Sequence, residues 1–174
     1  MSTENKSQSI LIVDDNISIL SFLSASLRDH GYDIITAANG SLAVEAARDN
    51  MPDLILLDIN MPEMDGYEAC KIIKSDKHTK EIPIIFISTQ GEKFNKLKAF
   101  EVGAIDYITK PILIEETLAR VSVHLNLSSK IAELEEFNKI MVDREMRIIE
   151  LKNEINEFAL KLGEKSPYPE VWND

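Results

Sequence analysis

The first two thirds of the chain alternate short apolar runs with stretches of helical spacing. The runs cover residues 10–13, 34–36, 54–57, 84–87 and 105–108. They are rich in β-branched residues and do not alternate with polar ones, which is typical of strands buried on both faces of a parallel sheet. We therefore expect five strands.

Apolar residues three and four positions apart predict a helix after each of the first four runs. The markers are Ile17, Leu20, Leu23 and Leu27, with Asp15 or Asn16 as N-cap; Leu42 and Ala46, capped by Ser41; Tyr67, Cys70 and Ile73; and Phe94, Leu97 and Phe100. A fifth helix begins at about Ile112. Strand and helix alternating five times predict right-handed crossovers and a doubly wound α/β sandwich, a (βα)5 fold.

The last third has a different period. A seam of three-four spacing contains apolar residues at nine positions and Lys130 and Arg144 at two others. The apolar members are Leu127, Leu134, Phe137, Met141, Ile148, Leu151, Ile155, Phe158 and Leu162. A heptad pattern of this length predicts a coiled coil. We thus divide the chain into a polar tail (1–8), an α/β domain (9–125), a coiled-coil continuation of the fifth helix (126–162) and, after Gly163, an extended tail (163–174).

Charge and composition exclude several classes of protein. The 174 residues include 30 acidic and 19 basic residues, a net charge of -11, which argues against binding to nucleic acid or to an anionic membrane surface. No run approaches the roughly 18 apolar residues of a membrane span, and the polar N-terminus does not resemble a signal peptide. We expect a cytoplasmic protein. Cys70, the only cysteine, is expected to be a buried small hydrophobic residue.

Polar residues follow four of the predicted strands. They are Asp14 and Asp15 after the first, Asp58 after the third, Ser88 after the fourth and Lys110 after the fifth. Because ligands of open parallel sheets bind at the carboxyl ends of the strands, these side chains are expected to share one edge. Each residue alone has an ordinary structural explanation as a helix cap, a turn former or a surface residue. Their joint placement is the specific signal.

Three neighbouring carboxylates repel one another, and Lys110 can offset only one of them. A hard divalent ion with oxygen ligands would neutralise the rest, and Mg²⁺ fits best. A carboxylate beside Mg²⁺ and a lysine is also a candidate nucleophile toward phosphorus, with the hydroxyl of Ser88 as a donor to the phosphoryl group. Asp58 is the best candidate nucleophile because it ends the central strand.

At this point the sequence resembles the receiver domain of two-component response regulators, over residues 9 to about 125. The resemblance rests on the segments ILIVDDN, LILLDINMPEMDG, PIIFIST and DYITKP. It implies a flavodoxin-like strand order, 2-1-3-4-5. It also implies that a partner histidine kinase or phosphotransfer protein delivers a phosphoryl group to Asp58.

The resemblance further assigns roles around Asp58. It implies that Asp14, Asp15, Asp58 and the main-chain carbonyl of Asn60 hold Mg²⁺. Lys110 would contact the phosphoryl group.

The same resemblance implies a conformational switch. The bond between Lys110 and Pro111 is expected to be cis. Ser88 would be the switch hydroxyl and Tyr107 the switch aromatic. Their movement would remodel the face made by the fourth helix, the fifth strand and the fifth helix.

Thr89 departs from the family pattern, which usually has a small residue after the switch hydroxyl. We hypothesise that its β-branched side chain restricts approach to Asp58 and slows both phosphorylation and hydrolysis.

Three functions from different classes remain open. The leading one is a phosphoacceptor signalling module, not an enzyme, that dimerises through the coil, with the remodelled face as a second candidate contact. The coil would either transmit the switch or serve as a constant tether. The second is the regulatory fragment of a larger enzyme, such as a sensor kinase or nucleotide cyclase. The third, an aspartyl-phosphate phosphohydrolase, needs a second acid two residues after the nucleophile, where this chain has Asn60.

Overall fold

The computed structural model describes residues 7–89 and 96–168, and within them five strands alternate with five helices. The strands are β1 (Ser9–Val13), β2 (Asp33–Ala37), β3 (Leu54–Asp58), β4 (Ile84–Thr89) and β5 (Asp106–Lys110). The helices are α1 (Ile17–Arg28), α2 (Gly40–Asn50), α3 (Gly66–Ser75), α4 (Lys96–Glu101) and α5 (Ile114–Lys161). Phe94, a predicted marker of the fourth helix, lies outside the described residues.

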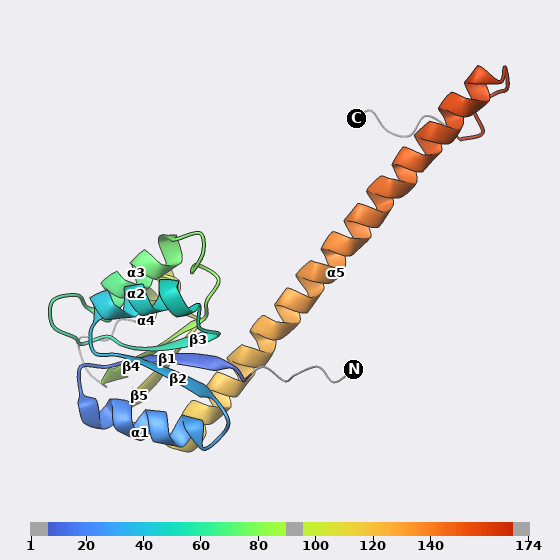
Figure 1. Ribbon diagram of the computed structural model, residues 1–174. Helices are drawn as coiled ribbons and strands as arrows, with labels where there is room; N and C mark the ends of the chain where they lie inside the picture. The colour runs from blue at the N-terminus through green and yellow to red at the C-terminus, as the bar shows by residue number, and fades with distance from the viewer. Residues whose placement is uncertain (1–6, 90–95, 169–174) are drawn as a thin grey trace. The chain divides into compact units, whose positions relative to one another are not determined.

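All strands are parallel and lie in the order β2-β1-β3-β4-β5 (Figure 1), which confirms the predicted doubly wound sheet. Three strands extend beyond their last apolar residue, so that Asp58, Ser88, Thr89 and Lys110 lie inside the ladder and not after it. Backbone pairing continues there because it does not depend on side-chain polarity. The register pairs Ser88 with Thr109 and Thr89 with Lys110.

Helices cover both faces of the sheet. Leu23 of α1 and Val121 of α5 pack against one face, while Ala43 of α2 and Cys70 of α3 pack against the other. All four side chains are fully buried, which confirms the expectation for Cys70. The strands are covered on both sides, and this explains why they read as continuous apolar runs.

Asparagines provide the first two helix caps. Asn16 caps α1 by accepting from the backbone N–H of Ser18 at 2.9 Å. The prediction that Ser41 caps the second helix is wrong: the side chain of Asn39 accepts from Leu42 N at 2.9 Å, and α2 begins one residue before Ser41. The asparagine oxygen reaches the free N–H of the first turn from a residue in extended conformation.

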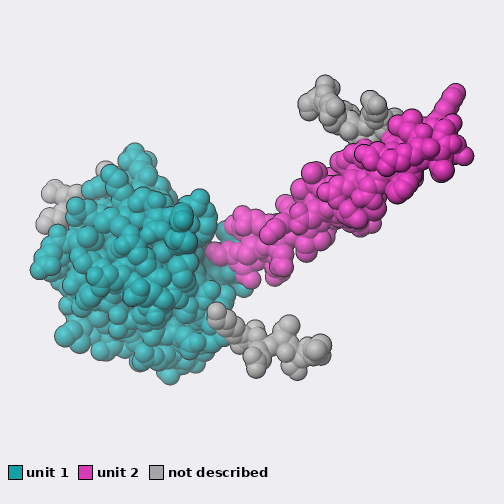
Figure 2. All heavy atoms as spheres, turned by 45° about the horizontal axis from the view of Figure 1, so that its top comes forward, with its two compact units in different colours: residues 1–127 teal, residues 128–174 magenta. Residues whose placement is uncertain are grey.

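The chain forms two compact units, residues 1–127 and 128–174, coloured separately in Figure 2. The helix α5 begins at Ile114, two residues after the predicted start, and continues without interruption through Ser128 and Ser129 to Lys161. Gly163 follows in a left-handed conformation, φ +77°. Within the described part of the tail predicted for residues 163–174, Tyr168 hydrogen-bonds back to the helix at Asn156. Among the described helices, none has a segment long and apolar enough to span a bilayer.

Candidate functional site

Two buried carboxylates converge on one ammonium group at the carboxyl edge of the sheet. Lys110 Nζ, at the end of β5, lies 2.8 Å from Asp14 Oδ2 and 2.7 Å from Asp58 Oδ1. Asp14 follows β1 and is fully buried, and Asp58 ends β3 and is 1% exposed. The strand order places β3 between β1 and β4, so that residues far apart in the sequence meet at this edge. Two carboxylates and one ammonium leave a net negative charge.

Burial makes Asp58 an unusual carboxylate. Its loss of solvent raises the pKa of Asp58 above the ordinary value, and the charge of Asp14 adds to the rise; Lys110 and the backbone N–H of Asn60 oppose it without cancelling it. Among the described residues, Asp58 Oδ1 accepts no well-formed hydrogen bond, although the Lys110 ammonium lies beside it. Burial would lower the pKa of Lys110, but the bonds to Asp14 and Asp58 outweigh it and raise that pKa. Burial thus disfavours the charged form of Asp58, whereas the two carboxylates favour the charged form of Lys110.

The predicted switch residues lie near this edge in different environments. Ser88 is 1% exposed, and its hydroxyl donates to the carbonyl of Thr89 at 3.1 Å. Thr89 itself is exposed at the surface. Tyr107 is half-buried and packs against the core under α2, α3 and α4. The bond between Lys110 and Pro111 is cis, as the resemblance implies.

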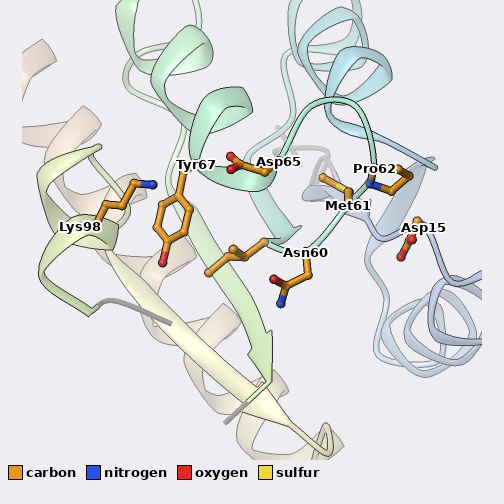
Figure 3. Close-up of a pocket in the computed structure, with 8 residues that line it drawn as sticks. Asp15, Asn60, Met61, Pro62, Asp65, Tyr67 and Lys98 are labelled. Carbon is orange, nitrogen blue, oxygen red and sulfur yellow. The ribbon is translucent and has the colours of Figure 1, made fainter. Parts of the chain in front are cut away.

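A pocket of about 540 Å³ is lined by residues that follow the two buried carboxylates in the chain (Figure 3). Asp15 and Asn60 line it, together with Tyr67 from α3 and Lys98 from α4. The Lys98 ammonium lies 4.2 Å from the centre of the Tyr67 ring. Asp15 and Asn60 are exposed, in contrast to Asp14 and Asp58. The site therefore combines two buried carboxylates with exposed residues that line a pocket.

The chain direction after β3 depends on a close backbone approach. A side chain at Gly66 would place its Cβ 2.3 Å from the carbonyl oxygen of Asp58 and 2.8 Å from Ile59 Cα. These neighbours are backbone atoms, which cannot move aside as a flexible side chain can. Asp65 then caps α3 by accepting from Glu68 N at 2.8 Å. Only glycine lets α3 begin this close to the backbone at the end of β3.

The donor chemistry of this edge fits a hard divalent cation. Asp14 and Asp58 supply buried carboxylates, Asp15 follows Asp14 directly, and Asn60 lies two residues after Asp58. The three acidic side chains were expected to come together. In the described part of the chain, no three acidic, histidine or cysteine side chains form a metal-binding group, and Lys110 bridges two of them instead.

Sequence reasoning missed a second charged cluster, on β5 and α5. Asp106 accepts from Arg120 Nη1 at 2.7 and 2.9 Å and lies 3.1 Å from His124 Nε2, while Glu116 accepts from Arg120 Nε at 2.9 Å. The signal was the four-residue spacing of Glu116, Arg120 and His124, which puts them on one face of a helix.

Carboxylates and a lysine at the carboxyl edge of a doubly wound parallel sheet are typical of a class of phosphoryl-accepting regulatory domains. The sequence model of the response regulator receiver domain matches residues 10–122. A transcriptional regulatory protein for alkaline phosphatase synthesis from Bacillus subtilis is 38% identical over 143 residues, which is 82% of this chain and 59% of that protein.

Solved structures of response regulators and receiver domains are also similar to this chain. A putative response regulator from Chloroflexus aurantiacus is 36% identical, with a TM-score of 0.66 over 70% of this chain and 99% of that one. The receiver domain of a Pseudomonas aeruginosa sensor histidine kinase, with magnesium coordinated in its active-site cleft, is 29% identical, with a TM-score of 0.64 over 69% of this chain and 98% of that one. The chain belongs to the response regulator receiver domain family. It spans 51% to 59% of the length of three curated relatives.

Proposed function

We propose that Asp58 is the phosphoacceptor of a signalling receiver that takes a phosphoryl group from a histidine kinase or phosphotransfer protein. The observation that carries the proposal is the convergence of Asp14 and Asp58 on Lys110 at the edge where β1, β3 and β5 end. The chemistry is transfer without turnover, so the chain is a signalling protein and not an enzyme.

The transfer is a single displacement at phosphorus. A carboxylate oxygen of Asp58 forms a bond to phosphorus while the bond from phosphorus to the donor's imidazole nitrogen breaks, and the imidazole keeps the electron pair. Lys110 already lies 2.7 Å from the carboxylate and would contact the phosphoryl oxygens as they arrive. The Ser88 hydroxyl would turn from the Thr89 carbonyl to donate to one of them.

Mg²⁺ would be held by Asp14, Asp15, Asp58 and the main-chain carbonyl of Asn60. When bound, it supplies positive charge that neutralises the phosphoryl oxygens. The relative from P. aeruginosa, with magnesium in its cleft, supports this assignment. Buried Asp14 and Asp58 would contribute ligands from inside the domain, while exposed Asp15 and Asn60 would complete the set from the pocket side.

Two further residues would report the transfer to the surface. As the Ser88 hydroxyl moves, half-buried Tyr107 would turn inward and reshape the face made by α4, β5 and α5. Leu97 and Phe100 of α4 are 75% and 52% exposed and make this face a second candidate contact between copies. Thr89 is exposed beside Ser88, which supports our hypothesis that it restricts approach to Asp58.

The coiled-coil part of α5 would pair two copies in parallel. All nine apolar seam residues are exposed in the single chain, from 37% at Met141 to 77% at Leu162. Apolar side chains along one seam of a long helix are covered most simply by the same seam of a second copy. Solution scattering with and without a phosphate mimic would distinguish a coil that switches from a constant tether, because only the switched coil changes its scattering.

The experiment that tests the acceptor is intact mass measurement after incubation with Mg²⁺ and a small-molecule phosphodonor. The wild type should gain the mass of one phosphoryl group, and Asp58→Asn should gain none. Asp53→Asn is the matched control, because Asp53 is an exposed carboxylate that precedes the same strand and binds Ser9. An adduct that persists in Asp58→Asn would contradict the proposal, and steady release of many phosphate equivalents from a phosphate ester would favour a phosphohydrolase.

A second candidate is the regulatory part of a larger enzyme. The chain spans little more than half of the curated relatives, and one solved relative is the receiver of a sensor histidine kinase. The acceptor chemistry would be the same in that setting. Binding to nucleic acid is not expected of this chain because of its net charge of -11, and a cytoplasmic location remains our prediction.

A further inference from the structure

The C-terminal tail folds back on the end of α5. Gly163 takes the left-handed conformation, φ +77°, and the next N–H, from Glu164, donates to the carbonyl of Ala159 at 2.9 Å. This arrangement ends a helix and reverses the chain. The red end of the ribbon in Figure 1 shows the chain returning beside α5.

Asn156 fixes the returning chain by its side-chain amide. Its nitrogen donates to the Tyr168 carbonyl at 3.0 Å, and its oxygen accepts from Tyr168 N at 3.1 Å. The Lys152 ammonium lies 5.6 Å from the centre of the Tyr168 ring. Ala159 is only 9% exposed, although the seam residues around it, Ile155 and Phe158, are 44% and 64% exposed. Tyr168 is therefore held at a defined place on the helix.

The heptad register shows where this part of the helix lies relative to the apolar seam. With Leu127, Leu134 and Ile148 at position a, Lys152 and Ala159 occupy position e, and Asn156 occupies position b. Position e borders the seam, and b lies next to e on the outer side. The tail thus covers one flank of the seam and leaves the seam itself open to a second helix.

The same register creates a conflict of charge between two parallel copies. Residues at position g face position e of the next heptad on the other helix, so Arg147 at g would face Lys152 of the partner subunit. Two cations directly opposite each other disfavour the parallel register. The Tyr168 ring is held beside Lys152, where it can lie between these cations.

The chemistry of Arg147 suits a ring on that flank. Its guanidinium binds Glu150 at 2.9 Å and approaches Glu154 at 3.8 Å on its own helix. Those bonds use the edges of the planar group and leave its faces for stacking on an aromatic ring.

We propose that Tyr168 is a clasp between two copies of this chain: its ring contacts Lys152 of its own helix and Arg147 of the partner subunit, and so fixes the parallel register of the coil. The clasp rests on the two-stranded coil of the proposed function. It converts a repulsive pair into two contacts between a cation and an aromatic face. The contact occurs twice in a symmetric dimer.

Cross-linking between two singly substituted chains tests the clasp directly. A chain with Tyr168→Cys is mixed with an affinity-tagged chain with Arg147→Cys and treated with a short bis-maleimide, and the covalent heterodimer is measured by mass. Each chain has only one of the two new cysteines, so a cross-link between positions 168 and 147 can form only between copies. Native Cys70 stays, because it is fully buried and burial raises its thiol pKa to about 12. The matched control is Glu150→Cys, at the outward-facing position c.

We expect a heterodimer with Arg147→Cys in several-fold higher yield than with Glu150→Cys. Equal yields would overturn the clasp. Cross-linking of Leu134→Cys at seam position a checks the coil separately: success there with no preference for position 147 refutes the clasp alone, whereas failure there refutes the parallel coil and the clasp together. Tyr168→Ala should weaken dimerisation about tenfold while Tyr168→Phe should not, as expected for a ring acting through its face.

Discussion

The two compact units differ in how far their apolar side chains are buried. In residues 1–127 the central strands are covered on both sides, and Leu56 and Phe86 are fully buried. In residues 128–174 Phe137 and Phe158 are 59% and 64% exposed. The first unit buries its own core, whereas the second presents an exposed apolar seam.

The difference separates chemistry from assembly. A closed core can hold carboxylates such as Asp14 and Asp58 away from water, where each acts strongly on a charged ligand. An open helix cannot desolvate a charge in this way, but it can offer a long contact. Acceptor chemistry and pairing should therefore fail independently, and the following substitutions test that independence, from the largest expected effect to the smallest.

Ile148→Asp should break pairing and leave the acceptor intact. It places a charge in the middle of the apolar seam, and we expect the dimer dissociation constant to rise at least about 100-fold, since a desolvated unpaired charge is so unfavourable. Sedimentation equilibrium gives the constant, and intact mass gives the phosphoryl adduct. Lys139→Asp, on the polar side of α5, is the control. Loss of the phosphoryl adduct in Ile148→Asp would show that phosphorylation depends on pairing of the helices.

Lys110→Ala should destabilise the first unit by about 3 kcal/mol, because it leaves two buried carboxylates without their cation. Urea denaturation with a chelator present measures the loss. Added Mg²⁺ should restore more stability to the variant than to the wild type, since the variant has the larger uncompensated charge. A variant as stable as the wild type would show that the Lys110 contacts do not offset the burial of Asp14 and Asp58.

Asp106→Asn should lower the free energy of unfolding by about 1–2 kcal/mol at pH 7 by weakening the bonds to Arg120 and His124. Burial would raise the pKa of Asp106, but these bonds and the N–H of Tyr107 outweigh it and hold the pKa below its ordinary value. The stabilisation is thus present above the unfolded-state pKa of about 3.9 and is lost as pH falls through the lower folded pKa. A deficit as large at pH 2.5 as at pH 7 would exclude the carboxylate as its source.

Thr89→Ala should speed phosphorylation by a small donor and hydrolysis of the adduct, each by a few-fold, because a side chain beside the approach to Asp58 is removed. The time course of intact mass after donor addition and removal measures both rates. Thr109→Ala, paired with Ser88 on the neighbouring strand, is a control for loss of a threonine in the sheet. Unchanged rates in Thr89→Ala would show that Thr89 does not restrict the approach.

The strands could be predicted because each buried strand contains a short, continuous run of apolar residues. The sequence also predicted that Asp14, Asp58 and Lys110 would meet, since strand ends share an edge in a parallel sheet. The cap at Asn39 was missed because serine and asparagine are both good caps and only the backbone conformation selects between them.

The spacing of apolar residues does not predict contacts between residues that are far apart in the sequence. The bonds of Asp106 to Arg120 and His124 need the position of α5 against β5, and the return of Tyr168 to Asn156 needs the chain reversal at Gly163. Periodicity gives the face of a helix but not the neighbour that it meets. The cluster and the tail are therefore visible only in three dimensions.

The most direct test of the account is to map the phosphorylated residue in the full chain. After treatment with Mg²⁺ and a phosphodonor, borohydride reduces an acyl phosphate to an alcohol, which marks the acceptor permanently for peptide mass mapping. We predict a single homoserine at position 58, in the wild type and in Ile148→Asp alike. A mark on Asp14 or Asp15, or no reduced residue in a chain that gained the phosphoryl mass, would contradict the assignment of Asp58.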